Sequence, residues 1–163
     1  MANIAKRIDE AVMLTRNREY LAALTEFLEI YGGEEPPNML LTTKTATGLS
    51  YFGLCLALVR KKIKPAIDLC KRALELQFYS ADHHANLARV YLAAENRKKA
   101  LQAVEEGLRI HPEDPGLIAV RKSLGIRARP TVPFLDRANP INVSLGKARY
   151  AKKIADREAR RKK

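Results

Sequence analysis

The chain has 163 residues, of which 30 are Lys or Arg and 18 are Asp or Glu, and its formal net charge is +12. This length suits one domain with an extension, and a hydrophobic content of 47% is enough for a packed core. Aromatic residues make up only 6%, Trp is absent, and Ala and Leu are abundant, which favours helix over sheet. No stretch approaches the roughly 18 apolar residues of a membrane span, so we predict none.

Two further features indicate the compartment. The N-terminus carries charged residues where a secretory signal peptide needs an apolar run. The two cysteines, Cys55 and Cys70, lie in helix-like stretches and are too few for a disulfide framework. We therefore predict a soluble, cytoplasmic protein in a reducing environment.

Residues 4–37 have the pattern of two short antiparallel helices. Apolar and small residues recur there at helical spacing, namely Ala11, Leu14, Tyr20, Ala23 and Phe27. Gly32-Gly33 and Pro36-Pro37 are typical of the end of a second helix. The nine residues 38–46 then separate this pair from the next one.

Residues 47–80 form a second predicted pair, with Ala66 and Ala73 as small residues of its second helix. The first helix fits two registers. Counted without a gap, Gly53 falls at position 7 of the pair. One extra residue in the turn Arg60–Lys64 instead puts Phe52 at 7, Gly53 at 8 and Leu56 at 11. We prefer the register with the extra residue, because it places a large apolar residue before a small one.

Residues 81–114 show the clearest pattern, in a stretch of 34 residues. Positions 7, 8, 11, 20, 27 and 32 of this stretch are Leu87, Ala88, Tyr91, Ala100, Gly107 and Pro112. Small residues at 8, 20 and 27 let two helices approach closely, and the Pro ends the second helix. This spacing resembles the tetratricopeptide repeat, and the earlier stretches resemble weaker copies of it.

The resemblance implies an all-α fold, a TPR-type α-solenoid of about three helix pairs in residues 1–126. The repeats are about 4–37, 47–80 and 81–114. The first is degenerate, as terminal repeats commonly are, and residues 115–126 form a capping helix over the third.

Residues 127–163 differ in composition. Pro130, Pro133 and Pro140 predict an extended segment up to the Asn139-Pro140 start of a basic helix. Residues 115–163 hold 14 basic and 3 acidic side chains, against 16 and 15 in residues 1–114. The segment RPTVPFLDRANPINVSLGKAR resembles one that follows repeats in other small bacterial proteins of this type. Its apolar part, Val132–Leu145, is predicted to dock on the repeats at least part of the time.

The resemblance also implies a concave groove that binds partners and is lined by the first helix of each pair. The groove residues predicted on this basis are Ile8, Val12, Tyr51, Cys55, Asn86, Arg89 and Leu92. In the shifted register the middle helix instead contributes Ser50, Leu54 and Ala57. Some family members grip a chaperone's C-terminal carboxylate with Lys and Asn at positions 5 and 9. Here these positions hold Ile8, Val12, Ala85 and Arg89, which argues against such a clamp.

Basic residues form a second candidate surface. The turns inside the second and third pairs contain Arg60, Lys61, Lys62, Lys64, Arg97, Lys98 and Lys99. Successive turns stack on one edge of a solenoid, so these cations predict a basic stripe. The tail adds Lys152, Lys153, Arg160 and Arg161. Solvated surface charge is the ordinary interpretation, and contact with nucleic acid or another polyanion is the functional one.

No pattern of catalytic or metal-binding residues was found. His83 and His84 are adjacent, so on a helix they point about 100° apart and cannot share one metal ion. We predict neither enzyme activity, cofactor nor metal. The leading hypothesis is an adaptor or scaffold that binds a protein partner. The alternative is a nucleic-acid- or ribosome-associated protein, and binding to an anionic membrane surface is a weaker third option.

Overall fold

The computed structural model describes residues 2–33, 43–125, 132, 134–135 and 139–161. These residues form helices and no strand. The helices are α1 (Ala2–Arg16), α2 (Tyr20–Tyr31), α3 (Thr43–Val59), α4 (Ile63–Leu76), α5 (Ala81–Ala93), α6 (Arg97–Ile110), α7 (Pro115–Leu124) and α8 (Pro140–Arg161). The chain divides into two compact units, Met1–Leu124 and Gly125–Lys163, which are described separately.

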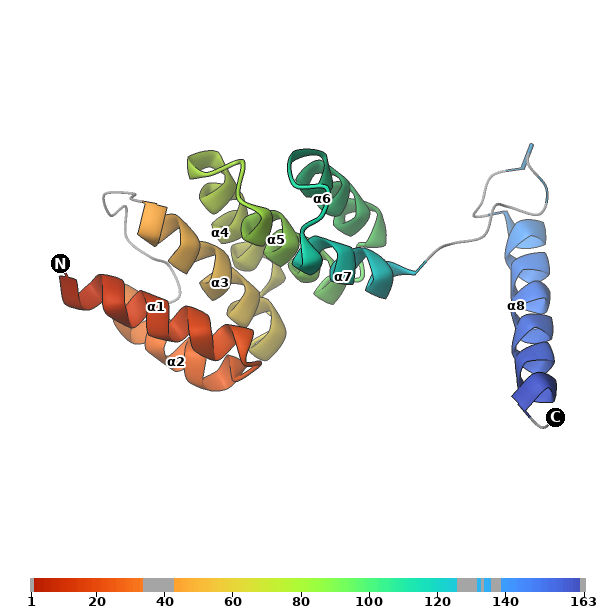
Figure 1. Ribbon diagram of the computed structural model, residues 1–163, viewed down its shortest axis with the longest axis horizontal. Helices are drawn as coiled ribbons and strands as arrows, with labels where there is room; N and C mark the ends of the chain where they lie inside the picture. The colour runs from red at the N-terminus through yellow and green to blue at the C-terminus, as the bar shows by residue number, and fades with distance from the viewer. Residues whose placement is uncertain (1, 34–42, 126–131, 133, 136–138, 162–163) are drawn as a thin grey trace. The chain divides into compact units, whose positions relative to one another are not determined.

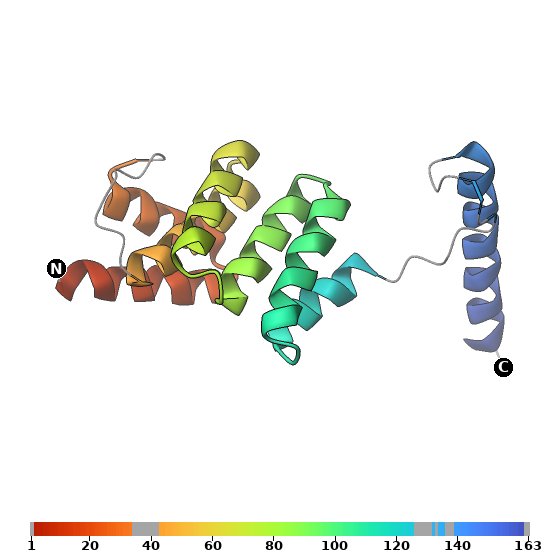
Figure 2. The same cartoon turned by 90° about the horizontal axis from the view of Figure 1, so that it is seen from above.

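The first unit is a stack of helix pairs (Figures 1 and 2). α1 packs on α2, α3 on α4 and α5 on α6, and α7 covers α5 and α6. The first helices of successive pairs also contact one another, whereas within the described residues α2, α4 and α6 do not. Because one layer of helices is close together and the other is splayed, the layer of α1, α3 and α5 lines the inner, concave side.

Small residues stand where the two helices of a pair approach. Ala88 and Ala100 are fully buried in the third pair, as the spacing predicts. In the middle pair Gly53 has the same role. A Cβ atom on Gly53 would lie 2.8 Å from the carbonyl oxygen of Ala66 and 3.0 Å from the Sγ of Cys70. The approach of α3 to α4 therefore requires a glycine at this position.

Hydrogen bonds at the turns bear on the register of the middle pair. In the first and third pairs, an N–H donates to the carbonyl five residues earlier, from Glu19 to Leu14 and from Asn96 to Tyr91. In the middle pair, the Lys62 N–H donates to Leu56, six residues earlier, at 3.3 Å. The Arg60 N–H, however, donates to Leu56 four residues earlier, as the Ala94 N–H does to Val90, and all three turns have three residues. The turn therefore contains no extra residue, and the shifted register remains a prediction.

All three turns use the same backbone device. Arg18, Lys61 and Glu95 have φ of 69°, 56° and 56°, and each is the second of the three residues that join the helices of a pair. A left-handed residue with a side chain costs about 1–2 kcal/mol. Its recurrence in every pair indicates that packing of the flanking helices compensates for this local cost.

Aromatic packing joins the first pair to the second. The ring of Phe52 on α3 lies 5.7 Å from that of Phe27 and 5.4 Å from that of Tyr31. At the other end, a Cβ on Gly107 would lie 2.8 Å from the Cβ of His84 and from a methyl carbon of Leu117. The missing side chain at Gly107 therefore makes room for both α5 and the capping helix α7.

The second unit contains α8 and the short stretch that precedes it. As predicted, Asn139 caps the helix, since its Oδ1 accepts a hydrogen bond from the Ile141 N–H at 3.0 Å. Asn142 hydrogen-bonds the backbone of Val132 through both its amide atoms, and donates to the Leu135 carbonyl. Most of the predicted extended segment 127–138 lies outside the described residues. Docking of Val132–Leu145 on the repeats remains a prediction.

A buried histidine makes the fold sensitive to acid. His83 on α5 is fully buried. Burial lowers its pKa from the ordinary 6.5, and this outweighs the opposing effects of Asp82 and of the Gln77 and Ala73 backbone. His83 therefore binds a proton more readily in the unfolded chain than in the folded chain. Above pH 6.5 this histidine does not lower the free energy of unfolding. Below pH 6.5 the free energy of unfolding falls by at most about 1.4 kcal/mol per pH unit.

Urea unfolding between neutral pH and about pH 5 measures this dependence. We expect His83→Gln to flatten the profile. Equal slopes in the wild type and His83→Gln would show that another group causes the acid sensitivity.

Candidate functional site

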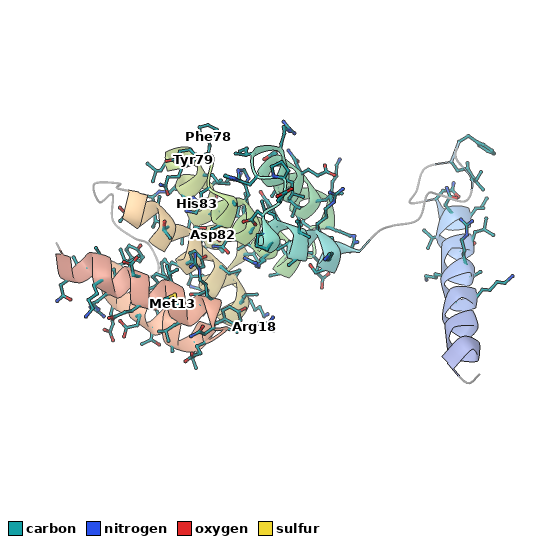
Figure 3. All side chains as sticks on the ribbon, viewed as in Figure 1. Met13, Arg18, Phe78, Tyr79, Asp82 and His83 are labelled. Carbon is teal, nitrogen blue, oxygen red and sulfur yellow. The ribbon has the colours of Figure 1, made fainter. Side chains whose placement is uncertain are left out.

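A polar cavity of about 470 Å³ lies on the concave side of the first unit. Its walls come from the first helix of every pair, together with the turn that follows α1 and the first residue of α2. The lining residues are Thr15, Arg16, Arg18, Tyr20, Tyr51, Leu54, Asp82, Asn86 and Arg89. We call this set the A-helix groove. Figure 3 labels two of its members, Arg18 beside the first pair and Asp82 on α5.

Arg16 crosses the groove. Its Nη2 lies 2.8 Å from the Oδ2 of Asp82, which joins the first pair to the third. Its Nε donates a hydrogen bond of 3.0 Å to the Tyr51 hydroxyl, and its guanidinium stands 5.6 Å from the centre of the Tyr51 ring. Burial is the main cause that raises the pKa of Tyr51, so this hydroxyl stays neutral at ordinary pH. All three pairs thus meet at Arg16.

Arg89 is held by a second set of contacts. Its Nη1 donates to the Oδ1 of Asn86 at 2.9 Å, and the Nδ2 of Asn86 donates to the Ser50 hydroxyl at 3.1 Å. Asn86 is fully buried, so the anchor of this arginine is rigid. The acceptor is a neutral amide, which orients the guanidinium without neutralising its charge.

The structure brings together some of the predicted groove residues and corrects others. Tyr51, Asn86 and Arg89 line the groove. Ile8, Val12 and Cys55 were predicted there but are 2%, 6% and 0% exposed, in the hydrophobic core. The Sγ of Cys55 lies 3.3 Å from the Thr15 hydroxyl, because this side chain points from α3 into the contact with α1. Leu92 is half-buried against the core and does not line the groove.

Leu54, which the sequence predicted for the groove in the shifted register, lines it. Ser50 and Ala57, predicted together with it, are fully buried. Four other groove residues were missed by the sequence prediction. Thr15, Arg16, Arg18 and Tyr20 lie at or after the end of α1, beyond the positions expected to face a partner. The signal for them was a pair of arginines, Arg16 at the end of α1 and Arg18 in the turn that follows, which only the curvature of the stack brings opposite α5.

The predicted basic stripe is exposed on the turns. Arg60, Lys61, Lys62 and Lys64 are exposed, as are Lys98 and Lys99, while Arg97 is half-buried. The ammonium of Lys99 lies 5.8 Å from the centre of the Tyr91 ring. In the tail, Lys152 is exposed, and the side chains of Lys153, Arg160 and Arg161 lie outside those described. None of the residues that line the A-helix groove belongs to this basic stripe.

A second hollow, of about 530 Å³, lies between α4, α5 and α6. Its lining mixes apolar residues such as Leu74 and Leu87 with charges of both signs, including Lys71 and Glu106. It has none of the hydrogen-bonded arginines of the A-helix groove. We therefore take the groove as the candidate site.

Two other kinds of site were searched for. Among the described residues, no cluster of His, Cys, Asp or Glu could hold a metal ion. Within the same residues, no helix has the length and hydropathy needed to cross a membrane.

The chain was compared with known proteins. No protein-family model matches the sequence, and no curated protein matches it. Among solved structures, it is similar to the crystal structure of the P58(IPK) TPR domain, with a TM-score of 0.56 and 18% sequence identity. The match covers 76% of this chain and 33% of the other, so the chain spans about a third of that structure's length. The helical stack and this likeness together show that the chain has the fold of a TPR-type α-solenoid.

Proposed function

We propose that this chain is a non-enzymatic adaptor or scaffold that binds a segment of a partner protein in the A-helix groove. The observation that carries the proposal is the construction of the groove. Three helices from three pairs contribute to one cavity, and Arg16 contacts residues of both other pairs. Such a surface exists only when the repeats are assembled, which suits recognition of an extended partner segment.

The composition of the groove also fits a peptide. The half-buried ring of Tyr20 offers apolar contact, while the arginine side chains offer hydrogen bonds. Few, well-held polar groups beside apolar surface are typical of selective binding sites. A cytoplasmic location and kinship with small bacterial repeat proteins remain predictions from the sequence.

The alternative, binding of nucleic acid, has its own support in the exposed turn cations and the basic tail. A matched pair of variants separates the two functions. Arg18→Glu/Arg89→Glu reverses two charges in the groove. Lys61→Glu/Lys98→Glu reverses two exposed charges on the turns, and Glu95 already occupies the left-handed position equivalent to Lys61.

We expect the wild type and the turn variant to capture the same proteins from a nuclease-treated lysate, identified by mass spectrometry. The groove variant should lose at least about nine-tenths of this capture, a change of about 1.4 kcal/mol or more. Thermal unfolding of each variant checks that the repeats stay folded. Loss of capture in the turn variant, or after nuclease treatment alone, would favour the nucleic-acid function instead.

A further inference from the structure

We propose that the A-helix groove recognises an acidic segment of its partner. In the free protein Asp82 forms an ion pair with Arg16, and a carboxylate of the partner replaces Asp82 on binding. This inference rests on the proposed function and adds the chemistry of the partner. It follows from the charges in the groove, from the exposure of one ion pair, and from the way Arg16 is held.

The groove has an excess of positive charge. Arg16, Arg18 and Arg89 line it together with a single carboxylate, Asp82. Among the described residues, only Arg16 of these arginines has an ion-pair partner. Guanidinium groups bind carboxylates through two parallel hydrogen bonds, which favours Asp or Glu side chains over other ligands.

The Arg16–Asp82 pair is easy to exchange. The two side chains are 52% and 47% exposed, and ion pairs at this exposure contribute little to stability. A carboxylate from a partner could therefore compete with Asp82 without unfolding the repeats.

Arg16 is held in place apart from its ion pair. Its Nε donates to the Tyr51 hydroxyl and its guanidinium stands at the Tyr51 ring, and neither contact uses the Nη2 that pairs with Asp82. The guanidinium is thus pre-positioned for an incoming carboxylate, so little side-chain freedom is lost on binding.

The groove fits an acidic peptide better than a nucleic acid. Its cations converge on one hollow that also contains a carboxylate, whereas a phosphate backbone is followed by a run of cations along a track. The half-buried ring of Tyr20 beside the arginines suits an apolar side chain placed next to acidic ones.

The test uses the full chain and a positional-scanning library of short peptides, in which each position is fixed in turn as every amino acid. We expect the wild type to prefer Asp or Glu at one or more positions. Arg16→Gln should lower binding of the selected acidic peptide about tenfold, the effect of losing one charge-assisted hydrogen bond. Asp82→Asn should raise it about three- to fivefold, because the internal competitor loses its charge.

The two variants are expected to change peptide binding in opposite directions, and this distinguishes exchange of the ion pair from a purely structural role of the pair. Both variants break the same ion pair, so an ion pair that only stabilises the groove would give weaker binding in both. Equal weakening in both variants would overturn the inference. Peptide binding without preference for acidic residues would also overturn it and leave the proposed function standing. Failure to retain any peptide, with retention of oligothymidine, would contradict the proposed function itself.

Discussion

Ala100→Asp is expected to unfold the third helix pair. Ala100 is fully buried in α6, as Ala88 is in α5, and the two helices pack against each other. The new carboxylate would have neither water nor a cation at this contact. An unpaired buried charge destabilises by several kcal/mol, so we expect a loss of at least about 3 kcal/mol from a total that is commonly 5–15 kcal/mol.

Ala22→Asp is the matched control. Ala22 stands near the start of α2, as Ala100 does in α6, but its side chain is exposed. Both changes place a negative charge close to a helix N-terminus, so the favourable dipole effect is common to both. Thermal unfolding followed by far-ultraviolet circular dichroism should show a large drop in midpoint for Ala100→Asp and a small one for Ala22→Asp. Equal midpoints would mean that α5 and α6 do not pack closely at this position.

Removal of residues 147–163 is expected to abolish most of the chain's affinity for polyanions. The deletion takes away nine basic and two acidic residues, which is seven of the twelve net positive charges. Release of counterions makes binding to polyanions depend steeply on the number of cations engaged. Affinity for heparin at moderate salt should fall by at least about a hundredfold, and its dependence on salt should become shallower.

The same truncation should leave the repeats intact, because Met1–Leu124 forms a compact unit with its own core. An unchanged thermal midpoint checks this. Unchanged heparin retention would move polyanion binding to the turn cations, which Lys61→Glu/Lys98→Glu then tests. No retention of the intact chain at low salt would remove the nucleic-acid alternative.

Local sequence rules predicted the parts of the fold that depend on neighbours in the chain. The small residues Ala88, Ala100 and Gly107 and the Asn139 cap are of this kind, because helix spacing and capping are set within a few residues. Features of this kind can be predicted from the sequence when a residue type has a single structural role at its position.

The groove could be predicted only in part, because it depends on how the pairs stack. Ile8 and Val12 occupy positions that the resemblance assigns to the groove, yet both are buried in the core, where Ile8 lies against Gly48 of α3. The Arg16–Asp82 contact joins residues 66 apart in sequence. Its formation depends on the curvature of the solenoid, which arises from packing between helices rather than from any local motif.

Site-specific photo-crosslinking tests most directly the claim that the concave groove binds a protein. A photoreactive phenylalanine analogue replaces Tyr20, which lines the groove, or Tyr79, which is exposed in the turn between α4 and α5 outside it (Figure 3). The account predicts crosslinks to a discrete protein from position 20, their loss in Arg18→Glu/Arg89→Glu, and few crosslinks from position 79. Crosslinks from position 79 alone, or to nucleic acid from either position, would contradict it.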